Sequence, residues 1–282
     1  MSSRCLNARV PCQTLADYLN EVKKIHKKWQ TGKVESKGDN IPLWFRGQRS
    51  AKWDLKPRFY REEYAQALES EIRLEFEGHG LQLTTTNLNR TKWEWYFLMQ
   101  HYGAPTRLLD WTGNPLAALY FAIADESTEI KNQDAAVWVF DPWRWNKMHF
   151  SGLSGPGLPG WKETQPYLPD LEDACNSERV RKRWPIAIDP PSIDRRLANQ
   201  AARFLMFGKE QDLVKAADRA RTERKKRIHL AEIRVAHEKL EDIRCELDDI
   251  GINHRVLFPD LEGLGKHLSW EWKGFRKAKR LY

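Results

Sequence analysis

Apolar residues recur at helical spacing in several parts of the chain. Thr14 suits the N-cap of a helix whose residues Leu15, Tyr18, Val22 and Ile25 form one apolar face. Similar spacing, with glycine, asparagine or proline at the ends, predicts five more helices, one of them with Asn114 and Pro115 as its N-cap and first residue. The six predicted helices cover residues 14–29, 61–78, 91–102, 116–125, 237–249 and 259–272.

Short apolar runs between these helices have the composition of buried strands. They cover residues 42–45, 106–109, 135–140, 186–188, 201–207 and 228–235. Helices and strands alternate irregularly, and there is no internal repeat. We therefore expect an α+β fold, with a mixed or antiparallel sheet and flanking helices. The segment 151–170 is rich in glycine and proline, and we expect a surface loop or lid there.

The length of 282 residues fits a single elaborated domain, and two tightly packed lobes are the alternative. We divide the chain into a lead-in helix and loop over 1–40, a main domain over 41–272 and a basic tail over 273–282. The hydrophobic share of 41% and the 13 tryptophans can fill a large core, so the mean hydropathy of −0.71 reflects a charged exterior.

Several classes of protein are disfavoured by what the chain lacks. No apolar run reaches the roughly 18 residues of a membrane span, and residues 1–11 have no apolar stretch typical of a signal peptide. The four cysteines are scattered, without the spacing of a zinc site or a disulfide framework. We expect a cytoplasmic protein with no membrane contact and no metal.

The net charge of +8 comes largely from two basic clusters. One runs from Arg219 to Arg227, and the other from Lys273 to Arg280. Such runs are most often solvated surfaces, although they also suit contact with a polyanion. Arg219 to Arg227 is the candidate surface for that contact.

Two segments carry polar residues that a core would not require. In residues 43–48, Arg46 and Gly47 end an apolar strand; the arginine suits a phosphate or carboxylate, and the glycine permits close approach to the backbone. An ion pair between Arg46 and Asp110 is the structural alternative.

The second segment, 98–116, supplies the other candidate residues for a site. Gln100 and His101 lie in the last turn of a predicted helix, where His101 can act as an acid or base near neutral pH or serve as a structural donor. Strand alternation places Thr106 and Asp110 on one face and Arg107 on the other, so Arg107 and Asp110 are expected to serve different partners. The candidates in this segment are Gln100, His101, Thr106, Arg107, Asp110 and Thr112.

The chain has no nucleophile-elbow serine, phosphate-binding glycine loop or metal-ligand spacing. The remaining set of arginine, glutamine, histidine, threonine and acid suits a phosphate-rich ligand bound without a metal.

The segments 44–48, 100–115 and 118–122 resemble the FRG domain family of bacteria and phages, which is named for its Phe-Arg-Gly motif. The resemblance covers about residues 40–125, and residues 257–264 look like the closing segment of the family. The family label implies no settled activity.

The same plan is similar, more distantly, to that of ADP-ribosyltransferases. The common features are an arginine at a strand end, a threonine-bearing strand, an alanine-rich helix and a late acid. This resemblance implies NAD as a substrate, with Arg46 gripping it, Thr112 orienting the arginine or the ribose, and Glu262 or Asp260 polarising the ribose or activating the acceptor. Gln200, followed by Arg203 and Phe204, looks like the segment that precedes the last motif of that superfamily.

The chain also departs from the transferase pattern. It has no Ser-Thr-Ser run at the second motif and no Glu-x-Glu or Gln-x-Glu pair on a late strand. Glu232 and Glu238 therefore stand beside Glu262 as alternatives for the third catalytic position.

Three hypotheses follow from these observations. The chain is an NAD-dependent ADP-ribosyltransferase-like enzyme, serving as a toxin or antiphage effector and modifying an unknown protein or nucleic acid. Alternatively, it is a module that binds nucleic acid or a nucleotide without catalysis. In the third hypothesis both motifs only stabilise the core. The catalytic candidates are Arg46, His101, Thr112 and Glu262, and the ligand-binding candidates are Arg46, Gly47, Gln100, Thr106, Arg107 and Asp110.

Overall fold

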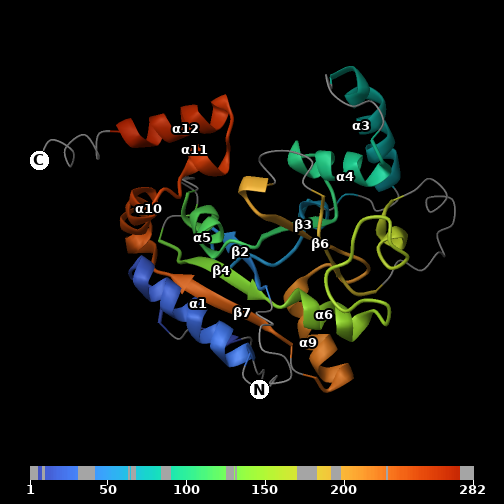
Figure 1. Cartoon of the computed structure of the whole chain (residues 1–282), viewed down its shortest axis with the longest axis horizontal. Coiled ribbons are helices and arrows are strands. Elements are labelled where there is room, and N and C mark those ends of the chain that lie inside the picture. Colours follow the sequence, from blue (N-terminus) through green and yellow to red (C-terminus); the bar gives the residue numbers. More distant parts are fainter. Residues whose placement is uncertain are drawn as a thin grey trace, which may run out of the picture.

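The protein is a single α+β domain built around one seven-stranded sheet (Figure 1). The computed structural model describes residues 6–7, 10–30, 42–62, 64, 68–83, 90–124, 130, 132–169, 183–191, 198–226 and 228–273. The segment 31–40, the tail 274–282 and Arg227 lie outside the described residues. In the described part of the chain, no helix combines the length and the apolar composition that crossing a bilayer requires.

The strands follow the order β1-β7-β4-β2-β3-β6-β5 across the sheet. β1 pairs with β7 in parallel and every other pair is antiparallel, so the sheet is mixed. The strands are β1 (Leu6–Asn7), β2 (Trp44–Gln48), β3 (Leu108–Thr112), β4 (Ala135–Phe140), β5 (Ile186–Ile188), β6 (Ala202–Met206) and β7 (Leu230–Val235).

Helices cover both faces of the sheet. Those described are α1 (Leu15–Gln30), α2 (Arg58–Arg61), α3 (Glu69–Leu83), α4 (Lys92–His101), α5 (Pro115–Ile123), α6 (Pro142–His149), α9 (Leu213–Arg224), α10 (Leu240–Asp249), α11 (His254–Leu257) and α12 (Leu261–Trp272), with short 3-10 turns η3 (Gln165–Tyr167) and η4 (His237–Lys239). Figure 1 shows α1, α5 and α10 beside the β7–β4–β2 part of the sheet, and α6 and α9 at its other side.

Helix α5 lies unusually close to β2, and Gly47 is the reason. A Cβ atom at Gly47 would lie 2.0 Å from the carbonyl oxygen of Ala118 and 2.6 Å from the amide nitrogen of Ala122. The alanines of α5 keep its contacting face shallow, so the helix backbone approaches the strand directly. Gly47 therefore permits this helix packing, and the ligand approach expected from the sequence stays a prediction.

The N-terminus of α5 follows β3 almost at once, and its cap fixes that turn. The Asn114 side chain accepts hydrogen bonds from the amides of Leu116 and Ala117, and Pro115 occupies the first turn, where its missing amide costs nothing. Residues 114 and 115 were predicted as this cap, and the structure confirms it.

The helix predicted over 61–78 is displaced in the structure. α3 spans Glu69–Leu83 and continues through Gly78 and Gly80. A Cβ at Gly80 would lie 2.9 Å from the Trp95 ring, so this glycine makes room for α4 instead of ending a helix. The sequence does not distinguish a packing glycine from a helix stop.

The predicted loop over 151–170 is a loop as far as residue 169, but it packs against the core. Leu153, Tyr167 and Leu168 are buried against β5 and β6, and Gly157 bridges to Ile188. Its described part is therefore an ordered wall of the domain.

We predict that Gly47→Ala destabilises the protein by about 3 kcal/mol or more, because its Cβ would meet backbone atoms of α5 that cannot rotate away. Urea denaturation measures the change. Gly265→Ala is the matched control: apart from its chain neighbours and the backbone of its own helix, no described atom lies within 4 Å of its Cβ position in α12. Alanine there therefore stabilises by up to about 1 kcal/mol. Equal stability of the Gly47→Ala and wild-type proteins would contradict the close packing of α5 on β2.

Candidate functional site

A pocket of about 270 Å³ opens on the face of the sheet that carries α5. It collects residues from β2, β3 and β6, the end of α4, the middle of α5 and the residue after α11. The lining residues are Phe45, Arg46, Gly47, Gln100, His101, Asp110, Trp111, Thr112, Phe121, Gln200, Ala202, Phe204 and Phe258.

The floor of the pocket follows from strand alternation. Phe45, Thr112 and Ala202 are paired across three strands and so present their side chains on one face, as do Asp110 and Phe204. The antiparallel order β2-β3-β6 thereby brings together residues that are far apart in the sequence.

Arg46 occupies the seam between β2 and β3. These strands are paired only at Phe45 and Thr112, and beside that position the Arg46 Nη1 donates a hydrogen bond to the main-chain oxygen of Asp110 at 2.7 Å. The same nitrogen is 3.9 Å from the Asp110 carboxylate, and the buried Nε has no hydrogen-bond partner among the described residues. Burial lowers the pKa of Arg46 to about 10, with Asp110 opposing the shift and Arg61 adding to it. Arg46 remains charged near neutral pH and keeps donor capacity for a ligand.

Asp110 is the only carboxylate among the residues that line this pocket. Its Oδ2 accepts a hydrogen bond from Gln100 Nε2 at 2.8 Å, and Gln100 Oε1 in turn accepts one from the Thr106 hydroxyl. The Asp110 side chain is 58% exposed. A chain of hydrogen bonds therefore holds a solvent-facing carboxylate beside the guanidinium.

Thr112 has both of its hydrogen-bonding roles filled by the backbone. Its hydroxyl donates to the Gln200 carbonyl at 2.5 Å and accepts from the Asn114 amide at 2.9 Å. Ala201 next to it has a φ of +46°, a conformation that is costly for a residue with a Cβ. Thr112 thus fixes the turn before α5 to the strained turn before β6.

Two side-chain amides hold the aromatic wall of the pocket. Asn199 donates to the Val256 carbonyl at 2.9 Å, and Gln200 donates to the Leu257 carbonyl at 3.0 Å. Phe258 follows directly, stacks on His254 at 4.2 Å between ring centroids, and meets Phe121 edge-on at 6.0 Å. The wall therefore depends on contacts between the turn before β6 and the segment 254–258.

Six of the residues predicted from the sequence lie together in this pocket: Arg46, Gly47, Gln100, His101, Asp110 and Thr112. His101 sits at the C-terminal end of α4, with its ring 4.8 Å from that of Tyr102. Thr106 does not line the pocket but reaches it through Gln100. The roles of these residues remain predictions.

Arg107 lies on the opposite side of β3, in a buried cluster. Its Nε donates to Glu69 at 2.5 Å, and its two other nitrogens donate to the carbonyls of Phe207 and Tyr167. Burial alone would lower the pKa of Arg107, but the Glu69 carboxylate and nearby tyrosines more than offset burial and raise it. The structure thus gives Arg107 and Asp110 different partners, as alternation predicts, and it places Arg107 outside the pocket.

The acids considered for the third catalytic position do not line the pocket. Glu262 is 74% exposed on α12 and pairs with Lys266, while Asp260 caps the same helix through the Gly263 amide. Glu232 is buried on β7 and pairs with Arg234. Glu238 lies in η4, beside His237 and Asp134.

Phe121, Gln200, Phe204 and Phe258 line the pocket but were not among the candidate site residues. All four lie in segments that the sequence resemblances had singled out, yet aromatic residues in such segments are also expected in a core. Only the sheet order shows that they surround Arg46 and Asp110.

The fold and the pocket define a mixed α+β domain with a set of polar residues at its β2–β3 seam. Residues 42–131 match the family model of the FRG domain, so the chain contains an FRG domain over this segment. No curated protein and no solved structure matches the chain. The matched residues include the pocket residues from Phe45 to Phe121, whereas Gln200, Ala202, Phe204 and Phe258 lie beyond them.

We predict that Arg107→Met destabilises the protein by about 3–5 kcal/mol, because it leaves the Glu69 carboxylate buried without its cation. Asp110→Asn, at an exposed position of the same strand, changes stability by less than about 0.5 kcal/mol. Chemical denaturation of both variants measures the difference.

The double variant Glu69→Leu/Arg107→Met removes both buried charges, and we expect it to recover part of the stability that Arg107→Met loses. If Arg107→Met proved as stable as Asp110→Asn, the buried ion pair would not have the structural role assigned to it.

Proposed function

We propose that the pocket binds NAD and that the protein is an ADP-ribosyltransferase-like enzyme. One observation carries the proposal: Arg46, Thr112 and Gln200 meet at a single pocket. These residues come from the three segments whose sequence is similar to the motifs of that superfamily. Arg46 is hydrogen-bonded to Asp110, which lies 64 residues further along the chain. Thr112 is hydrogen-bonded to Gln200, which lies 88 residues further along.

The chemistry of the lining residues supports a dinucleotide ligand. The Arg46 guanidinium offers charged donors to a pyrophosphate oxygen, and the rings of Phe121, Phe204 and Phe258 offer faces or edges to a planar base. The volume of about 270 Å³ suits one nucleoside-sized half of NAD, with the rest of the ligand extending toward solvent.

We assign to Asp110 the stabilisation of the positive charge that forms on the ribose during the reaction. When the bond between nicotinamide and ribose breaks, its electron pair goes to the nicotinamide nitrogen and a positive charge develops on the ribose. A carboxylate held by Gln100 stabilises that charge without reorienting. An acceptor nucleophile then bonds to the ribose and loses its proton, and water in that place gives free ADP-ribose. Asp110 thus takes the role first considered for Glu262, because Asp110 is the carboxylate that lines this pocket.

We predict that the wild-type protein releases nicotinamide from NAD and that Asp110→Asn lowers the rate by on the order of 10²-fold. Arg46→Gln lowers it as well, chiefly through a higher KM for NAD, because the guanidinium binds the ligand. Chromatography of nicotinamide, with and without cell lysate as a source of acceptor, measures both effects.

Arg219→Ala is the control variant, since Arg219 of α9 pairs with Glu210 and does not line the pocket. Melting temperatures near that of the wild type confirm that each variant is folded. Absence of release under every condition, or release that Asp110→Asn leaves unchanged, would exclude this reaction. If the proposal holds, expression in bacteria slows growth and Asp110→Asn relieves it, as expected of a toxin or antiphage effector.

The second candidate function is binding of a nucleic acid through the basic end of α9. Arg219 and Arg221 there pair with Glu210 and Asp218, while Arg224, Lys225 and Lys226 are exposed. These three cations favour a phosphate backbone as ligand.

For nucleic-acid binding we predict that the logarithm of affinity falls with the logarithm of salt concentration with a slope of about 2–3, one unit for each phosphate neutralised. Replacing Arg224, Lys225 and Lys226 together by glutamine abolishes this dependence. Fluorescence anisotropy with a labelled oligonucleotide measures it. An affinity that is insensitive to salt would contradict this second function.

A further inference from the structure

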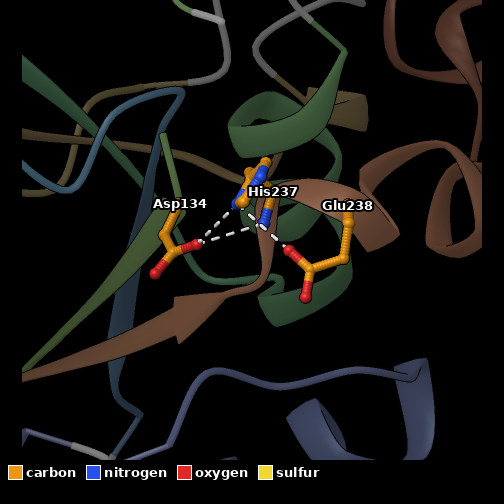
Figure 2. A group of neighbouring side chains, drawn as sticks. All are labelled: Asp134, His237 and Glu238. Carbon is orange, nitrogen blue, oxygen red and sulfur yellow. Dashed lines mark hydrogen bonds and ion pairs between the residues drawn. The ribbon is translucent and has the colours of Figure 1, made fainter. Parts of the chain in front are cut away.

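Asp134, His237 and Glu238 form a cluster outside the pocket (Figure 2). Asp134 directly precedes β4, and His237 and Glu238 begin the η4 turn after β7. Because β4 and β7 are paired through Ala135 and Val235, the end of one strand lies beside the start of the other. Pairing therefore joins residues that lie 103 positions apart in the sequence.

One ring nitrogen faces both carboxylates. His237 Nδ1 lies 3.5 Å from an Asp134 oxygen and 3.0 Å from a Glu238 oxygen, as the dashed lines of Figure 2 show. All three atoms lie within 4.8 Å of one another. Two ligand atoms of a tetrahedral zinc site are about 3.4 Å apart, so two of the three separations already have that size.

The backbone keeps the cluster in place. The His237 amide donates to the Asp134 carboxylate at 3.1 Å, and the Ala51 amide donates to the Asp134 carbonyl at 2.9 Å. In the part of the chain that the structure describes, neither the Asp134 nor the Glu238 carboxylate contacts a lysine or arginine. Two negative charges thus converge on an imidazole with no other cation against them.

We propose that Asp134, His237 and Glu238 bind one divalent transition-metal ion, with Zn²⁺ as the best match. A nitrogen and two carboxylate oxygens suit Zn²⁺, Co²⁺ or Mn²⁺, and the imidazole favours these over Mg²⁺ and Ca²⁺. A metal ion binds a ring nitrogen that carries no proton, so Nδ1 has to be unprotonated when the ion is bound. The side chains are 30–55% exposed, which leaves a coordination position to water and an open entry path.

The ion would tie the start of β4 to the turn that leads into α10. This role is independent of the NAD chemistry, since none of the three residues lines the pocket.

Calorimetric titration of the purified full chain with ZnCl₂ tests the site. We expect one ion per chain at this site, with at least tenfold weaker binding in His237→Ala and in Glu238→Gln. Asp134→Asn is the most selective variant, because asparagine keeps the oxygen that accepts from the His237 amide and loses the charge. His79→Ala is the matched control, since His79 is an exposed histidine on α3.

A second measurement separates this site from adventitious binding to the cysteines. Co²⁺ bound here shows the visible absorption of nitrogen and oxygen ligands, without the intense ultraviolet band of a thiolate ligand. Zn²⁺ also raises the melting temperature of the wild type and of His79→Ala, but not of His237→Ala. Failure of the wild type to bind Zn²⁺, equal binding by wild type and His237→Ala, or a thiolate band that accounts for all of the Co²⁺ would each overturn the proposal.

Discussion

The contact between α5 and β2 is the constraint on which the rest of the site depends. At Gly47 the helix backbone and the strand backbone come so close that no side chain fits between them. Because α5 starts three residues after β3, its position also fixes where β3 can lie beside β2. The two strands then pair at one position, Phe45 with Thr112, and the seam beside it takes the Arg46 guanidinium. Phe121 lies on the same helix, so this packing also places it in the lining of the pocket.

Alternation along β3 places one charged residue in the core and another at the pocket. Arg107 enters the core and neutralises Glu69 there, whereas Asp110 faces the pocket and is supported by Gln100. These two charged residues lie three positions apart, yet Arg107 is buried and Asp110 is more than half exposed to water. A low-dielectric core demands a paired charge, and an exposed carboxylate can accept a ligand.

Much of the fold was predictable from the sequence, because helix caps and the alternation of side chains along strands agree with how the elements pack. The α+β class, the cap at Asn114 and Pro115, and the opposite orientations of Arg107 and Asp110 all follow from the sequence. The extent of α3 was wrong, since a glycine that accommodates Trp95 looks like one that ends a helix. The helices α6 and α9 were not predicted, because the short α6 is dominated by tryptophan and the exposed side of α9 by charge.

The site was predictable only in part, for a reason of topology. Residues 43–48 and 98–116 supplied the candidate residues, and six of those candidates line one pocket. Gln200 precedes β6 and Phe204 lies on it, so the order of the strands places both beside β3. Phe258 follows α11, whose last residues are held by the side chains of Asn199 and Gln200. The grouping of Asp134 with His237 likewise depends on the pairing of β4 with β7. Local sequence patterns do not encode such long-range neighbours.

The partial burial of Arg46 has an energetic consequence for any anion that enters the pocket. Its side chain is only 16% exposed, and in the described part of the chain its buried Nε has no partner. Folding has therefore already removed most of the water from this cation. For an exposed arginine, the same desolvation free energy is lost only when a ligand binds. An arriving anion has to shed its own hydration shell but displaces little water from the arginine. The stability of the packed domain, set by contacts such as that of α5 on β2, thus keeps this cation largely dehydrated before any anion arrives.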